Sequence, residues 1–160
     1  MAFFLLKKNP IKTHMKIKLL ALTLTILLFT ACNSYKSANT ALVSGNFQQA
    51  FEQSTQAYFK NPSEKNGIKY VPLIFEAYHK GQQADENRLK EIETLTNPSK
   101  YQEAYQVILR LQERQKTISG INGRIVNGKN YNFKTKDYTE AFKTIQEKYA
   151  QFLYNDGKSF

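Results

Sequence analysis

Apolar residues after residue 45 recur mostly three and four positions apart, the period of amphipathic α-helices. The first such run lies between residues 45 and 62, and its closing Asn-Pro pair ends it because proline disfavours helix in the residue before it. Ser63 or Asn66 can cap the next run. Pro72 lies inside that run, and we expect it to occupy the first turn of a helix that starts near Val71.

Three more stretches complete the helical pattern. After Gly81 the apolar period resumes and ends at an Asn-Pro pair at 97–98, and the next stripe runs from Tyr101 to Arg114. Asp137 is placed to cap a final helix, which the pattern predicts to end near Tyr154 with Leu153 on its buried side. The sequence therefore predicts an all-α fold.

One short segment departs from this period. Residues 120–133 read GINGRIVNGKNYNF, in which Asn127-Gly128 separates two short β-prone runs. This is the strongest local signal for a two-residue hairpin turn. We expect a small β-hairpin insertion near 121–134.

Small and aromatic residues in the first run stand at a family's characteristic offsets. Gly45, Phe47, Ala50, Ala57 and Pro62 resemble the second helix of a tetratricopeptide repeat, with residues 34–44 as its short first helix. The aromatic-to-alanine spacing recurs twice more at uneven intervals, which indicates a degenerate repeat. The resemblance implies stacked helical hairpins with a surface that binds other chains. The alternative is an ordinary amphipathic helix that carries alanines.

The segment before Cys32 has the layout of a signal peptide. Two lysines, at 16 and 18, precede an uncharged, mostly apolar run of 13 residues from Leu19 to Ala31, which is shorter than the roughly 20 residues that cross a bilayer. A second basic region precedes Met15, so translation starts at Met1 or Met15, and the doubled basic region favours Met15.

The last four residues of this segment, Phe29-Thr30-Ala31-Cys32, resemble the lipobox of bacterial lipoproteins, with Phe29 where leucine is usual. The resemblance implies cleavage before Cys32, diacylglycerol on its thiol and an acylated amino group. By analogy with family sorting signals, Asn33 is compatible with the outer membrane, facing the periplasm. Cys32 is the only cysteine and cannot form an internal disulfide. The alternative is a buried free cysteine.

These features predict three parts: a signal peptide over residues 1–31, a lipid anchor and short tether over 32–39, and one helical repeat-like domain over 40–160. Removal of residues 1–31 from the 160-residue chain leaves 129, enough for one hydrophobic core. The layout from Asn87 to Tyr154 also resembles a group of small bacterial lipoproteins, a likeness that implies no activity.

Catalytic residue types are scarce after Cys32. His79 is the only histidine there, so the usual zinc sites and Cys-His pairs are excluded. The acidic pairs at 85–86 and at 91 and 93 lie among Arg88 and Lys90, which favours a solvated, salt-bridged helix face over a pair of catalytic acids. No phosphate loop or GxSxG motif is present. We therefore expect no enzymatic activity, no metal or other cofactor and no small-molecule substrate.

The positive charge of the chain is concentrated near the predicted hairpin and gives a set of candidate binding residues. Of the formal charge of +10, five lysines precede Cys32, which leaves +5 afterwards. Eight basic and two acidic residues lie between 97 and 136. The candidate binding residues are those of the basic, aromatic insertion: Arg124, Lys129, Tyr131, Phe133, Lys134 and Lys136. The alternative is a hairpin whose aromatic side chains pack on the final helix while its lysines are merely solvated.

The sequence favours a non-catalytic protein-interaction or scaffold module in the cell envelope, anchored to lipid through acylated Cys32. We expect the contacts with an envelope protein partner to fall between Tyr58 and Tyr78. The competing hypothesis is a surface module that binds phosphate-rich glycolipid or cell-wall polymer through the insertion. Export argues against nucleic acid as a partner.

Overall fold

The computed structural model describes residues 34–158, so the signal segment and Cys32 lie outside the described residues. The described chain is mostly helical, as the sequence predicts, with one small antiparallel hairpin. A helical segment over residues 34–43 is followed by α2 (Phe47–Lys60), α3 (Glu64–Thr94), α4 (Lys100–Ile118), β1 (Arg124–Val126), β2 (Lys129–Tyr131) and α5 (Thr139–Gly157).

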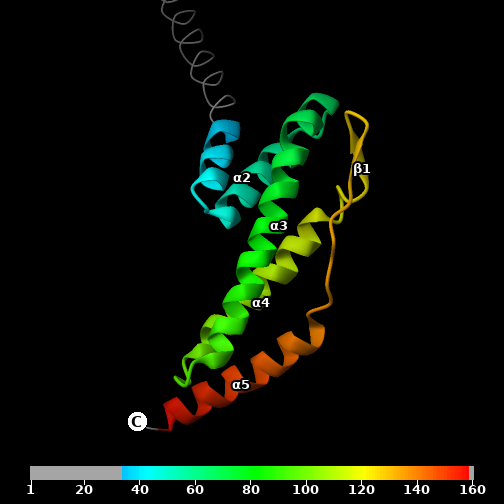
Figure 1. Ribbon diagram of the computed structural model, residues 1–160. Coiled ribbons are helices and arrows are strands. Elements are labelled where there is room, and N and C mark those ends of the chain that lie inside the picture. The colour runs from blue at the N-terminus through cyan, green and yellow to red at the C-terminus, as the bar shows by residue number, and fades with distance from the viewer. Residues whose placement is uncertain (1–33, 159–160) are drawn as a thin grey trace, which may run out of the picture.

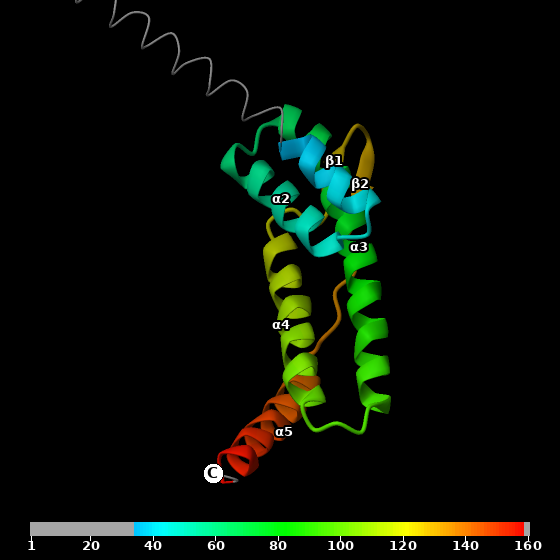
Figure 2. The same ribbon diagram turned by 90° about the vertical axis from the view of Figure 1, so that its left-hand side faces the viewer.

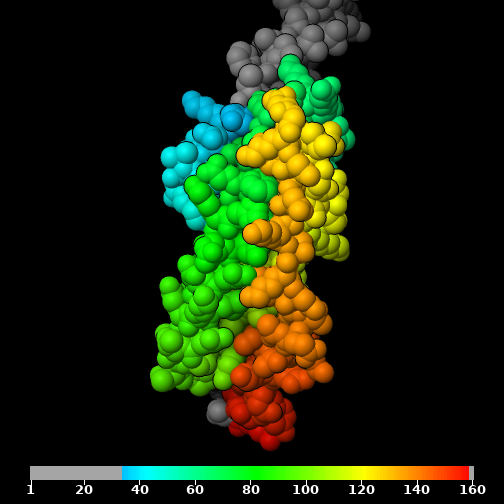
Figure 3. Space-filling model, turned by 45° about the vertical axis from the view of Figure 1, so that its right-hand side comes forward, coloured from blue at the N-terminus to red at the C-terminus, as the bar shows by residue number. Residues whose placement is uncertain are grey.

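Helix α3 forms the spine of an elongated molecule (Figures 1 and 2). The 34–43 segment, α2 and the β-hairpin surround its first half, which is the upper half of Figure 1. Helix α4 returns antiparallel to the second half of α3, and α5 packs against α4. Figure 3 shows the hairpin and the following connector, in yellow and orange, along the side of α3. Residue 34 and the end of α5 therefore lie at opposite ends.

The first two helical segments form a hairpin that turns at Gly45, whose φ of 82° is a conformation that glycine adopts without strain. Asn46 caps α2, because its side chain accepts a hydrogen bond from the Gln49 amide at 3.2 Å. Helix α2 ends before the Asn-Pro pair, as predicted. Residues 34–39, expected as a tether, are helical, and Ala38 within them is fully buried.

The predicted role of Pro72 was wrong. Helix α3 starts after the Ser63 cap and runs without a break through Pro72 to Thr94, so Pro72 is an interior residue and no helix starts at Val71. A proline inside a helix costs about 3 kcal/mol. Burial offsets this cost here, because apolar side chains on both sides of Pro72, among them Ile74, are completely buried.

Two separate groups of buried apolar residues stabilise the fold. The upper core joins the 34–43 segment, α2, the first half of α3 and the hairpin; it includes Phe51, Tyr58, Val71, Ile74, Tyr78, Ile118, Tyr131 and Phe133. The lower core joins the second half of α3 to α4 and the start of α5; its buried members are Ile92, Ala104, Val107, Ile108, Leu111 and Tyr138. Helices α3 and α4 contribute to both cores.

A polar layer lies between the two cores, and Asp85 is at its centre. The Asp85 carboxylate accepts hydrogen bonds from Arg110 and Arg114, each at 2.8 Å. Arg114 is only 2% exposed and also donates to Gln48 at 2.6 Å. A Cβ at Gly81 would lie 3.1 Å from the Arg114 guanidinium carbon, so glycine makes room for this buried cation.

The hairpin prediction is confirmed. Strands β1 and β2 are antiparallel, and Val126 pairs with Lys129 across the turn. Asn127 and Gly128 both have positive φ, 48° and 73°, as a type I′ turn requires. Ile125 is the middle residue of β1 and points away from the core, whereas Val126 is buried.

Helix α5 begins one residue later than an Asp137 cap predicts, with Tyr138 at its N-cap, and it continues further than expected. Asp137 lies just before it and accepts a hydrogen bond from the Thr139 amide at 2.8 Å. The helix runs past Tyr154 to Gly157, and a Gln151–Asn155 side-chain bond of 3.0 Å spans its last turn. None of its residues is buried, and Leu153, predicted on the buried side, is 50% exposed.

Candidate functional site

The two aromatic residues of the insertion belong to the core. Tyr131 and Phe133 are 7% and 2% exposed. The Phe133 ring lies 5.3 Å from the rings of Phe75 and Tyr78 on α3, in edge-on contacts. They attach the hairpin to α3, rather than to the final helix as the sequence-based alternative proposed, and they are unavailable to a ligand.

The basic residues of the insertion do not converge on one site. The Arg124 guanidinium lies over the Tyr58 ring, 5.4 Å from its centroid, and Lys129 lies over Tyr131. Lys136 is further along the connector, with its ammonium 3.7 Å from a Glu86 carboxylate oxygen. Arg124 and Lys129 thus belong to the hairpin, whereas Lys136 belongs to the polar layer.

Lys134 affects two α3 residues, Tyr78 through a backbone hydrogen bond and His79 through its charge. Its carbonyl oxygen accepts a hydrogen bond from the Tyr78 hydroxyl at 2.6 Å, while its side chain is exposed. Burial raises the pKa of Tyr78 to about 12, so the hydroxyl remains a proton donor. Burial also lowers the pKa of His79, and the nearby charge of Lys134 lowers it further.

The three tyrosines between residues 58 and 78 are unavailable to a partner. Tyr58, Tyr70 and Tyr78 are 2%, 4% and 0% exposed. Each lies in the upper core, because α2 and the first half of α3 face each other there. These three tyrosines therefore stabilise the fold, and partner contacts through the exposed residues of the region stay a prediction.

Glu86 and Tyr138 form the most perturbed titratable pair. The Tyr138 hydroxyl donates to a Glu86 carboxylate oxygen at 2.5 Å. This hydrogen bond lowers the pKa of Glu86, while burial raises the pKa of Tyr138. The pair connects the start of α5 to α3, and Tyr138 lines a shallow, mostly open hollow together with Gln115 and Lys136. Within residues 34–158, no group of three or more His, Cys, Asp and Glu side chains could hold a metal ion.

A groove of about 400 Å³ lies between α5 and the α3–α4 hairpin. Aliphatic side chains from all three helices form its floor: Leu89, Ile92, Ala104, Ile108 and Ile145. Glu93, Glu140, Ala141, Thr144 and Lys148 lie along its rim. The groove is therefore mostly apolar inside, with charges of both signs at its edge.

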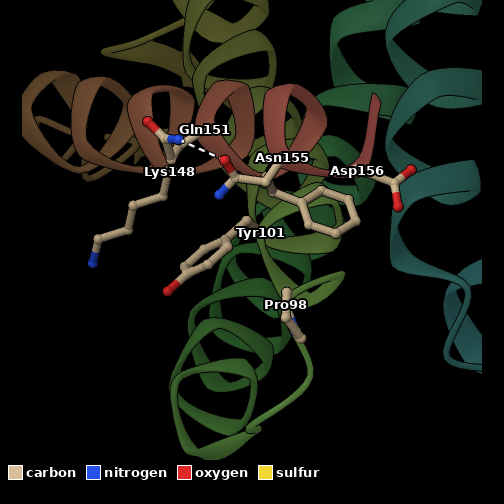
Figure 4. Close-up of a pocket in the computed structure, with 7 residues that line it drawn as sticks. Pro98, Tyr101, Lys148, Gln151, Asn155 and Asp156 are labelled. Carbon is tan, nitrogen blue, oxygen red and sulfur yellow. Dashed lines mark hydrogen bonds between the residues drawn. The ribbon is translucent and has the colours of Figure 1, made fainter. Parts of the chain in front are cut away.

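A second hollow of about 430 Å³ continues the groove toward the end of the molecule. Figure 4 shows Pro98 and Tyr101 on one side of it and Lys148, Gln151 and Asn155 of α5 on the other. Tyr101 and Lys148 line both hollows. The two hollows therefore form one continuous surface along α5.

Two lysines flank Tyr101 in this groove, and they differ in their partners. The Lys100 ammonium donates to the carbonyl oxygens of Leu95 and Glu93, at 2.6 and 3.3 Å, and so closes the end of α3. The Lys148 ammonium lies 5.7 Å from the Tyr101 ring centroid. Among the residues that the structure describes, no carboxylate lies within ion-pair distance of Lys148.

The groove stays open because α5 packs by one edge only. The rings of Phe142 and Tyr149 lie 5.4 and 5.5 Å from that of Tyr105 on α4. Each of these α5 rings is only half-buried. The helical period in the sequence located the apolar face of α5 but could not show which part of that face α4 leaves uncovered.

In the described part of the chain, no helix is both long and apolar enough to cross a membrane. Comparison of the whole chain with protein-family models, with curated proteins and with solved structures finds no match.

Proposed function

We propose that this protein is a lipoprotein of the cell envelope, held by acylated Cys32 on the periplasmic side of the outer membrane, and that it docks a partner protein without catalysing a reaction. Its helical hairpins are of the tetratricopeptide-like kind that presents a binding surface. The observation that carries this proposal is the apolar groove beside α5, a helix that buries none of its own residues.

The occupant that the groove fits best is an amphipathic helix of the partner. An aliphatic floor accepts apolar anchors at helical spacing, as in other helix-in-groove interactions. Ala104, Ala141 and Thr144 are small, which lets a second helix backbone approach closely. An acidic residue on that helix would meet Lys148, whose ammonium lies near the Tyr101 ring and forms no ion pair within residues 34–158.

Site-specific photocrosslinking tests the docking part. A photoreactive residue at Thr144, inside the groove, should give one adduct of defined mass in cells that contain the full chain. Ala141→Arg fills the groove and should abolish the adduct. Ala150→Arg is the matched control, because Ala150 is also an exposed alanine of α5 but does not line the groove. Equal loss in both variants, or no adduct at Thr144, would contradict docking in the groove.

Charge reversal examines the chemistry of the partner. Lys148→Glu replaces the cation beside Tyr101 with an anion on an exposed side chain. We expect the adduct yield at Thr144 to fall at least tenfold. Lys143→Glu makes the same charge change elsewhere on α5 and should leave the yield unchanged. An unchanged yield with Lys148→Glu would exclude an acidic contact at this point.

The anchoring part is tested by intact mass. Wild-type protein extracted from membranes should have the mass of residues 32–160 plus acyl chains, and Cys32→Ala should lack the acyl chains. An unmodified full-length chain in the soluble fraction would overturn the lipoprotein proposal.

A further inference from the structure

We propose that the upper end of the molecule is a membrane-contact surface that lies flat on an anionic phospholipid bilayer. We call it the anchor-end surface and define it by Tyr35, Lys65, Ile68, Lys69, Ile125 and Lys129. The proposal rests on the anchoring at Cys32 proposed above. It adds an orientation: the long axis of the protein stands away from the bilayer, with the groove at the far end.

Three elements meet at this end: the start of the 34–43 segment, the start of α3 and the tip of the hairpin (Figures 1 and 2). The Ser34 and Tyr70 hydroxyl oxygens lie 3.2 Å apart, which ties the first described residue to α3. A Cβ at Gly67 would lie 3.5 Å from the Arg124 Nε, which places β1 against the same turns of α3. The 34–43 segment and the hairpin are therefore both fixed to the start of α3, which gives this surface a defined shape.

Its apolar side chains are exposed although the upper core is closed. Tyr35, Ile68 and Ile125 are 36%, 42% and 69% exposed. Strand register fixes the position of Ile125, because side chains alternate along β1 and Val126 occupies the inward position. Exposed apolar side chains next to lysines suit a surface that contacts a bilayer.

The charge of this end matches anionic lipid. Basic residues within 59–70 and 122–131 number five, at 60, 65, 69, 124 and 129, against one acidic residue, Glu64. Lys69 lies over the rings of Tyr35 and Tyr70, and Lys129 over that of Tyr131. Within residues 34–158, neither lysine forms an ion pair. Lysines beside aromatic and aliphatic side chains suit the headgroup region of a bilayer.

The short distance along the chain between Cys32 and Ser34 favours a bilayer, rather than a protein, as what this surface contacts. Ser34 is two residues from Cys32, and two residues span at most about 7 Å even when extended. Acylation of Cys32 therefore holds Tyr35 and its neighbours at the headgroups however residue 33 is arranged. A surface held there permanently meets lipid before it meets anything else.

The same geometry determines where the groove stands. Helix α3 has 31 residues, which corresponds to about 46 Å at the usual rise per residue. The groove adjoins its second half and the anchor-end surface its first turns. An upright molecule would hold the groove roughly 40 Å from the headgroups, clear of the bilayer and open to a partner.

Tryptophan fluorescence tests the orientation directly, because the chain contains no tryptophan. The acylated mature protein is reconstituted in vesicles of equal parts phosphatidylcholine and phosphatidylglycerol, with brominated acyl chains as quencher. Ile125→Trp should shift to shorter wavelength and be quenched at least twofold. Leu153→Trp, at the opposite end and 50% exposed, is the matched control and should not be quenched. Ile68→Trp is a second probe of the same surface.

Lysine substitutions test the part played by charge. Lys65→Glu with Lys129→Glu should remove most of the quenching of Ile125→Trp, and Lys143→Glu with Lys148→Glu, on α5, should not. Quenching equal to that of Leu153→Trp, in protein that still floats with the vesicles, overturns the orientation and leaves the anchor standing. Equal quenching in pure phosphatidylcholine overturns the role of anionic lipid. Protein that does not float overturns the anchor and, with it, this surface.

Discussion

The upper and lower halves of the molecule are built from similar amphipathic helices but bury them to very different degrees. In the upper half, α3 is covered by the 34–43 segment, by α2 and by the hairpin, and residues such as Ile74 and Tyr78 are completely enclosed. In the lower half, α4 and an edge of α5 cover α3, and the groove stays open. The difference shows that similar amphipathic helices form a closed core where several elements cover them and an open groove where only one edge of α5 does.

The two halves meet at the buried pair of Asp85 and Arg114, so breaking this pair should have the largest effect. Asp85→Ala leaves the Arg114 guanidinium, which is 2% exposed, without a carboxylate. We expect a loss of about 3–5 kcal/mol in the free energy of unfolding, measured with urea. Arg110→Ala removes the 38% exposed partner and should cost about 1 kcal/mol or less. Equal losses of stability in Asp85→Ala and Arg110→Ala would contradict the special role of the buried Asp85–Arg114 pair.

Matched truncations in the two cores sharpen the comparison. Ile74→Ala removes a completely buried side chain from the upper core and should cost about 2–5 kcal/mol, because it leaves a cavity. Ile145→Ala removes the same atoms from a half-buried position beside the groove and should cost roughly 1 kcal/mol. Both are measured by urea unfolding. Similar losses would mean that the lower core is as closed as the upper one.

Substitutions at the starts of α2 and α5 distinguish unfolding of the whole upper half from local opening of α5. Asn46→Ala removes the cap of α2, and Asp137→Ala removes the side chain that binds the Thr139 amide before α5. Asn46→Ala should cost about 1 kcal/mol in α2, and Asp137→Ala should weaken only the start of α5. In hydrogen exchange, Asn46→Ala should lower protection throughout the upper half. Asp137→Ala should raise exchange in α5 alone, since α5 can open without the upper core. Loss of protection in α2 with Asp137→Ala would refute this independence.

The smallest expected effect is the change in stability with pH that comes from His79, which packs against the upper core. Burial keeps the folded pKa of His79 below its unfolded value, near 6.5, so the unfolded chain binds more protons between these two values. Stability should therefore be constant above about pH 7 and fall as the pH drops through 6.5 toward the lower, folded pKa. His79→Gln should lack this step when urea midpoints are compared at two pH values. Glu86 titrates lower, because its pKa is reduced, and so lies outside this window.

Local patterns in the sequence determined the helices, their main stops and the hairpin. Asn-Pro ended α2, Ser63 capped α3, and Asn127-Gly128 formed the turn, because each acts through backbone geometry within a few residues. The predicted role of Pro72 failed for the opposite reason. Whether a helix continues past a proline depends on how much apolar surface its neighbours bury, and no local pattern contains that quantity.

The candidate site depended more on tertiary structure. The sequence identified Arg124, Lys129, Tyr131, Phe133, Lys134 and Lys136 as one basic, aromatic set, and the fold divides it. Alternation along β2 turns Tyr131 into the core, and the connector carries Lys136 to Glu86. Adjacent residues in a strand or connector face different surroundings, so proximity in sequence did not give a common surface.

By itself, the sequence determined that this chain is mostly helical with a hairpin near its C-terminal third, because helical period and turn chemistry are local properties. Only the tertiary structure decided that α5 would bury none of its residues and leave a groove beside Lys148. It also decided that Ile68 and Ile125 would stay exposed while Tyr70 and Val126 beside them became buried. Both outcomes depend on how distant helices cover one another, which is a balance of burial over the whole molecule.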